Sequence, residues 1–138
     1  MNFLFEAKNS SNLQLSKKFK QFQDIFRELF LNHNIDVSKV ESNYRIQINV
    51  NNQKLYTPVE NMGTGMHEFI IFLTYLVFQN ESVLFIEEPE IHLHPTMQSR
   101  FIGCILKYSS SNQIMLITHS PNIDRKSTRL NSSHRIRS

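Results

Sequence analysis

The 138-residue chain has one cysteine, three glycines, four prolines and no tryptophan. A single cysteine, Cys104, excludes an internal disulfide framework and a cysteine-based zinc site, so a reducing cytoplasm is the expected location. The glycines Gly63, Gly65 and Gly103 do not form the G-x-x-x-x-G-K-[ST] pattern, which excludes a phosphate-binding P-loop from this sequence. The longest apolar run, residues 69–78, is too short to span a bilayer, and we expect neither a membrane partner nor a signal peptide.

The formal net charge of +3 is unevenly distributed along the chain. Five of the fifteen basic residues follow residue 123, and residues 1–123 hold ten Lys and Arg against eleven Asp and Glu, a net charge of −1. A basic surface that would indicate nucleic-acid binding is therefore not predicted for the globular part. DNA is compatible with the sequence as a partner, but nothing in the sequence indicates it.

The last fifteen residues differ in kind from the rest. Residues 124–134 read DRKSTRLNSSH and resemble the translation of a common sequencing-library adapter, and residues 135–138 continue without periodicity. We expect 124–138 to be a non-native, disordered tail, with a native solvated basic tail as the alternative. Residues 1–123 are then the domain, and we expect the native protein to continue beyond it.

The first half of the domain predicts a helix, a small hairpin and a second helix. Residues 13–31 carry apolar side chains at spacings of three and four, the pattern of an amphipathic helix. Residues 44–50 alternate apolar and polar side chains as a half-buried strand does, and residues 54–57 can return as its partner after a turn at Asn51-Asn52. A loop over 61–65 precedes a largely buried helix over 68–78.

The second half predicts a βαβ unit. Residues 82–87 and 113–118 are short continuous apolar runs, typical of parallel strands covered on both faces. Residues 96–108 are long enough for the crossover helix that parallel neighbours require. The expected fold class is therefore α/β, with a parallel βαβ core behind an N-terminal helix and a small β-hairpin. Because ligands bind beyond the carboxyl ends of such strands, Glu87-Glu88 and Thr118-His119 should face the same crevice.

Two adjacent acids at the end of a buried strand suit nucleotide hydrolysis. In the segment 83–95, VLFIEEPEIHLHP, one carboxylate can hold Mg²⁺ against the β- and γ-phosphates of a nucleotide. The next can orient and deprotonate the attacking water.

This segment resembles the Walker B and D-loop region of ABC-type ATPase heads, and especially the OLD (overcoming lysogenisation defect) and related AAA-type ATPases, in which EEPE-x-HLHP recurs. The resemblance implies that Glu87 is the Walker B acid that binds magnesium and that Glu88 is the catalytic base. It places residues 90–94, including His94, in a D-loop that crosses a dimer interface close to nucleotide. Many ABC proteins have Asp where this chain has Glu87.

Two further segments fit the same family. His119 follows the next buried strand and resembles the switch histidine that contacts the γ-phosphate; taken alone, a histidine there is more often structural. Gly63, Thr64 and Gly65 precede a helix, as the ABC signature motif does, which in the family contacts the nucleotide of the opposite subunit. Taken alone, this loop reads as a helix cap.

The resemblance covers roughly residues 15–123 and implies the C-terminal lobe of a P-loop NTPase head that lacks Walker A. In the complete protein two heads would form a head-to-head homodimer around two ATP molecules with Mg²⁺. Residues 1–138 alone are expected to be inactive. Two alternatives stand beside this reading: a metal-dependent hydrolase using His92, His94 and the glutamates, and a non-catalytic dimerisation module.

Overall fold

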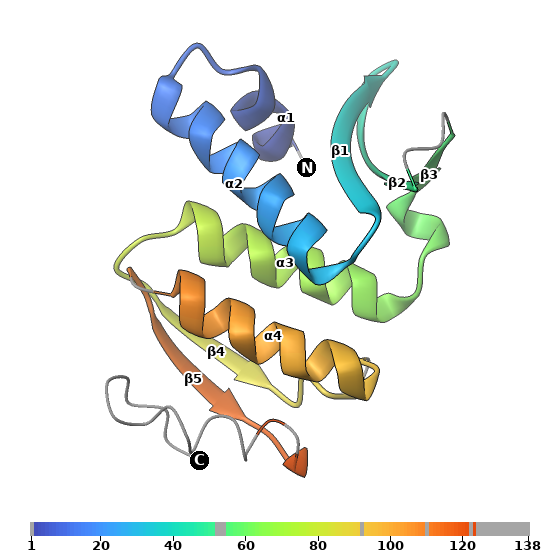
Figure 1. The fold of residues 1–138 in the computed structure, drawn as a ribbon. Coiled ribbons are helices and arrows are strands. Elements are labelled where there is room, and N and C mark those ends of the chain that lie inside the picture. The colour runs from blue at the N-terminus through green and yellow to red at the C-terminus, as the bar shows by residue number, and fades with distance from the viewer. Residues whose placement is uncertain (1, 52–54, 92, 110, 122, 124–138) are drawn as a thin grey trace. The chain divides into compact units, whose positions relative to one another are not determined.

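The computed structural model describes residues 2–51, 55–91, 93–109, 111–121 and 123 (Figure 1). The expected tail over 124–138 thus lies outside the described residues. The chain divides into two compact units, Met1–Val77 and Phe78–Ser138, and each is considered by itself. Among the described residues no helix is both long and apolar enough to cross a membrane.

The first unit begins with two helices, α1 (Asn2–Asn9) and α2 (Leu13–Leu29). The side chain of Asn12 caps α2 by accepting the backbone N–H groups of Gln14 and Leu15, which have no partner inside the helix. The apolar residues of α2 point to one side and are buried: Phe19, Phe22, Ile25, Phe26 and Leu29. The predicted amphipathic helix is therefore confirmed, ending two residues early, whereas α1 was not predicted.

A three-stranded antiparallel sheet follows, with strand order β1 (His33–Val40), β2 (Asn43–Val50), β3 (Tyr56–Pro58). Ile35 stands opposite Ile48 and Val37 opposite Ile46, so the buried side chains share one face of the sheet. The predicted hairpin corresponds to β2 and β3, with β3 shorter and later than expected. Its predicted turn falls partly on Asn52, outside the described residues. The sequence reading missed β1.

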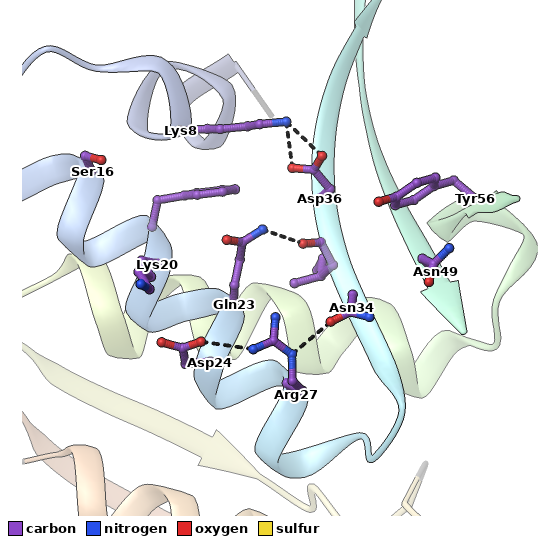
Figure 2. Close-up of a pocket in the computed structure, with 12 residues that line it drawn as sticks. Lys8, Ser16, Lys20, Gln23, Asp24, Arg27, Asn34, Asp36, Asn49 and Tyr56 are labelled. Carbon is purple, nitrogen blue, oxygen red and sulfur yellow. Dashed lines mark hydrogen bonds and ion pairs between the residues drawn. The ribbon is translucent and has the colours of Figure 1, made fainter. Parts of the chain in front are cut away.

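Polar contacts hold the helices of this unit to β1, as Figure 2 shows. The ammonium group of Lys8 on α1 lies 2.7 and 2.8 Å from the two carboxylate oxygens of Asp36. The side-chain amide of Gln23 on α2 donates to the carbonyl of Ile35 at 2.8 Å. The side chain of Ile35 is buried in the core, and its backbone carbonyl accepts the bond from Gln23. This bond holds α2 beside β1 in addition to the packing of the buried apolar side chains.

A short 3-10 helix, η1 (Val59–Asn61), leads through Met62 and Gly63 into α3 (Thr64–Phe78). Residues Phe69, Ile70, Leu73, Leu76 and Val77 of α3 are buried. The ring of Phe69 meets Phe30 edge-on at a centroid distance of 5.0 Å, an arrangement that aromatic pairs favour. The predicted helix over 68–78 is confirmed and begins four residues earlier.

The second unit is the predicted βαβ unit, made of β4 (Val83–Glu87), α4 (Pro95–Tyr108) and β5 (Gln113–Ile117). The strands pair in parallel from Val83 opposite Gln113 to Glu87 opposite Ile117. Their carboxyl ends therefore lie at the same edge of the sheet. The α/β fold class and the parallel core are confirmed.

The expectation that both faces of these strands are covered is wrong for the part of the chain that the structure describes. On one face Ile114 and Leu116 are buried, and α4 runs alongside the pair (Figure 1) with Phe101 and Ile102 buried. On the other face Val83, Phe85 and Ile117 are 53%, 69% and 51% exposed. A continuous apolar run indicates that both faces can be covered, but covering the second face takes a layer that these residues do not supply.

Candidate functional site

Glu87 is the last residue of β4, opposite Ile117 in the parallel register. It follows Phe85 on the open face of the pair, because alternate residues of a strand share a face, and it is exposed. The carboxylate thus stands at the carboxyl edge of the sheet, where an oxygen ligand for a cation is accessible.

Glu88 has an unusual backbone conformation, with φ of 46°. This left-handed region costs a residue with a Cβ atom about 1–2 kcal/mol, and such conformations gather at functional sites. The Glu88 N–H still donates to the carbonyl of Ile117 at 2.8 Å. The chain therefore leaves the ladder directly after this bond.

His119 lies two residues beyond the end of β5. Its Nε2 is 3.5 Å from Oε1 of Glu88, and the two side chains are 83% and 38% exposed. At that distance and exposure an ion pair would add little stability. The structure nonetheless brings together the acid that follows β4 and the imidazole that follows β5, as expected for parallel strand ends.

Glu90 holds the same region together and was not singled out from the sequence except as part of the D-loop. Its Oε1 accepts the backbone N–H of His119 at 2.6 Å. Burial raises the pKa of this carboxyl, but hydrogen bonds from the Thr118 hydroxyl and from the backbone N–H groups of Glu90, His119 and Ser120 outweigh burial and lower the pKa. The segment after β5 therefore donates hydrogen bonds to the carboxylate of Glu90.

Gln98, in the first turns of α4, makes a second connection. Its amide nitrogen donates to the carbonyl of Leu93 at 3.0 Å, and its amide oxygen accepts the hydroxyl of Ser120 at 2.7 Å. Among the described residues of this unit, Gln98 and Ser120 are the polar residues that are buried. The sequence reading did not find Gln98. A glutamine near the start of a crossover helix is usually exposed, and its sequence position does not distinguish that case from a buried, hydrogen-bonded side chain.

These residues surround an open cavity of about 400 Å³. Glu88 and Glu90 line it from the β4 side, His119 and Ser120 from the β5 side, and Gln98 from α4. One general base candidate and one imidazole thus meet at the carboxyl end of the sheet, which is where ligands bind in parallel α/β folds.

His94 has a structural role in the described part of the chain. It is the N-cap of α4, and its Nδ1 lies 2.9 Å from the hydroxyl and 3.4 Å from the backbone nitrogen of Thr96. His92, its partner in the zinc alternative, lies outside the described residues. Within the residues that are described, no three His, Cys, Asp or Glu side chains are grouped as metal ligands.

Gly63, Thr64 and Gly65 belong to the first unit, whereas Glu87, Glu88 and His119 belong to the second. Gly63 precedes α3, and its carbonyl accepts the N–H of Met66 at 3.0 Å as the helix begins. A Cβ atom added at Gly63 would meet no atom within 4 Å. The space beside Gly63 is therefore open, and packing inside the described chain does not require glycine at this position.

The chain matches a family model and a curated protein. A family model described as an AAA ATPase domain matches residues 2–123. An uncharacterized protein of Methanocaldococcus jannaschii is 31% identical over 123 residues, which are 87% of this chain and 15% of that protein. The chain thus spans a small part of the curated relative that it matches.

Solved structures of SMC ATPase heads are similar in fold. One, from work on ATP-driven dimerization and DNA-stimulated activation of SMC ATPases, is 15% identical with a TM-score of 0.64 over 79% of this chain and 71% of that chain. The Smc head domain of Pyrococcus furiosus, solved with an extended coiled coil and bound to the C-terminal domain of ScpA, is 17% identical with a TM-score of 0.64, over 82% and 31%. That of Pyrococcus yayanosii is 18% identical with a TM-score of 0.62, over 80% and 23%. The predicted fold, part of an ABC-type P-loop NTPase head, is confirmed.

Proposed function

This chain belongs to the AAA ATPase domain family, and we propose that it is the C-terminal half of a head that binds and hydrolyses ATP with Mg²⁺. The observation that carries the proposal is the meeting of two strand ends: Glu88 follows Glu87 at the end of β4 and lies 3.5 Å from His119 after β5. The phosphate-binding loop would come from another part of the complete protein, since this sequence has no such pattern.

In this proposal Glu87 is the Walker B acid. Its exposed carboxylate at the sheet edge suits Mg²⁺, which takes one or two carboxylates together with phosphate and water oxygens. The ion would offset the negative charge of the β- and γ-phosphates. Glu87 would orient the metal and leave the proton chemistry to its neighbour.

Glu88 would act as the general base. A carboxylate that is 38% exposed can accept the proton of an attacking water, and the carboxylate of Glu88 lies beside His119. His119 would donate a hydrogen bond to the γ-phosphate through an imidazole that is largely exposed.

A head-to-head homodimer would complete the site. Gly63, Thr64 and Gly65 would approach the nucleotide of the opposite subunit, for which the open space beside Gly63 leaves room. His94, at the start of α4, would lie on the D-loop near the interface. The SMC ATPases similar in fold dimerize in an ATP-driven way, and that likeness supports the same arrangement here.

The finer identity that we propose is an OLD-like ATPase of the cytoplasm, on the basis of the EEPE-x-HLHP phrase and of the single, buried Cys104. DNA is a weaker candidate as a partner. Its support is the likeness to SMC heads, whereas the basic excess of this chain lies after residue 123.

The test is Glu88→Gln in the full-length protein, with Glu81→Gln as a matched control. Glu81 also has a positive φ, 54°, and also donates its N–H across to the β5 side, but from the opposite end of β4. We expect Glu88→Gln to keep ATP binding and lose turnover by about 100-fold or more, as a lost general base does. Turnover equal to that of Glu81→Gln would contradict the proposal.

A further inference from the structure

The side-chain amide of Gln98 is buried, with 7% of the residue exposed. Burying an amide costs folding free energy unless the amide is hydrogen-bonded. Gln98 is the fourth residue of α4, just inside the helix that joins β4 to β5. Both ends of its amide are used, and both reach residues outside the helix.

The chemistry of the partners fixes which way the amide points. The carbonyl of Leu93 can only accept a hydrogen bond, so the atom facing it at 3.0 Å must be the NH₂ nitrogen. The amide oxygen then faces the Ser120 hydroxyl at 2.7 Å and accepts from it. The position requires one donor and one acceptor at once, which glutamine supplies.

The two partners lie on the two segments that carry the proposed chemistry. Leu93 is in the turn after β4, which follows Glu88, and Ser120 is next to His119 in the segment after β5. The bond from the His119 N–H to Glu90 connects the same two segments. Beyond Ile117 the β ladder has ended, so these side-chain bonds contribute to where the segment after β5 lies, together with the local bond from Ser120 N–H to the Thr118 hydroxyl and the burial of Ile123.

We propose that Gln98 is a positioning residue for ATP hydrolysis: it holds the segment that carries His119 against the turn that follows Glu88. The inference rests on the proposed function. A displacement of about 1 Å in a reacting group can lower turnover about 100-fold. A residue that acts through the groups it positions can therefore control the rate.

The deciding variant is Gln98→Glu in the full-length protein. A carboxylate at this position keeps the acceptor for Ser120 but cannot donate to Leu93, and it would face that carbonyl and the Glu90 carbonyl, 3.5 Å from Nε2 of Gln98, with a negative charge. The protonated acid can donate again. Burial and the nearby Glu90 carboxylate both favour the protonated form, so function should return as the pH falls.

We expect kcat of Gln98→Glu to be about 10- to 100-fold below that of wild type at pH 8. The kcat of the variant, as a fraction of the wild-type kcat, should rise as the pH falls to 5.5. Gln98→Leu should lose kcat at every pH, because it has neither donor nor acceptor. ATP affinity should change little in both. Gln113→Glu and Gln113→Leu, at an exposed glutamine where β5 begins, are the matched controls.

Ser120→Ala keeps the test valid if the Gln98 variants do not fold. It removes the hydrogen bond between Ser120 and Gln98, and it changes the side chain less. It should lower kcat, and Gln98→Leu should cost less in the Ser120→Ala background than alone. Wild-type kcat in Ser120→Ala overturns the inference, as does a pH-independent ratio for Gln98→Glu. If Glu88→Gln is inactive in the same assay, either result leaves the proposed function standing. Wild-type turnover in Glu88→Gln overturns the proposed function and this inference with it.

Discussion

The backbone N–H of His119 donates to Oε1 of Glu90 across 2.6 Å, although the two residues are 29 positions apart in the chain. The bond joins the turn after β4 to the segment after β5 beyond the point where the strands stop pairing. The side chain of His119 is left exposed, with its Nε2 near Glu88. Glu90 thus places His119 by its backbone and leaves its imidazole available.

The charge of Glu90 should appear in the pH dependence of stability. Because its pKa in the folded state is below the ordinary 4.5, the carboxylate stabilises the fold above that value, and this contribution is lost as the pH falls through 4.5 toward the lowered pKa. Glu90→Gln should be less stable than wild type at pH 7, and the difference should shrink below pH 4.5. Thermal midpoints of the full-length proteins across pH 3.5–7 test this. A constant difference would contradict the assignment.

The backbone of Glu88 predicts an unusual order of stabilities. Ala pays the cost of a Cβ atom at positive φ and Gly does not, so Glu88→Gly should be more stable than Glu88→Ala by about 1 kcal/mol. Both should be inactive if Glu88 is the base. The same pair at Glu81, where φ is 54°, should show the same order of stability with turnover retained. Denaturation midpoints and ATPase rates are the measurements, and an Ala variant as stable as the Gly variant would exclude the strain.

His119 predicts a loss of turnover without a loss of fold. Its side chain is 83% exposed, so His119→Ala should leave the melting temperature nearly unchanged, whereas a lost contact to the γ-phosphate should lower kcat about 10- to 1,000-fold. His33→Ala, in the first unit, controls for the loss of a histidine. Unchanged kcat in His119→Ala would remove His119 from the proposed site.

The absence of a P-loop pattern predicts that residues 1–138 alone do not hydrolyse ATP. Without the loop and its lysine, most phosphate contacts are missing. The full-length protein, assayed in parallel, is the positive control. Turnover by the isolated chain that disappears in its Glu88→Gln variant would show that the chain is catalytic by itself, and turnover that persists would indicate a contaminating ATPase.

The sequence by itself determined the βαβ core and the ends of its strands. Two continuous apolar runs separated by a stretch of helix length can pair in parallel, and parallel pairing puts Glu88 and His119 at one edge. It determined α2 for a similar reason, since a stripe at spacings of three and four has one way to be buried. β1 was not predicted because only two of its residues, Ile35 and Val37, are buried. Two such residues are too few to show the alternating pattern of a strand.

Tertiary structure alone decided how the site is held. The positive φ of Glu88 depends on where the chain must go after its bond to Ile117, and no local pattern encodes that direction. His119, which donates to Glu90, and Ser120, which donates to Gln98, lie 29 and 22 residues away from these partners. Hydrogen bonds over such separations depend on side chains meeting after the strands have paired, and sequence spacing carries no period that would predict them.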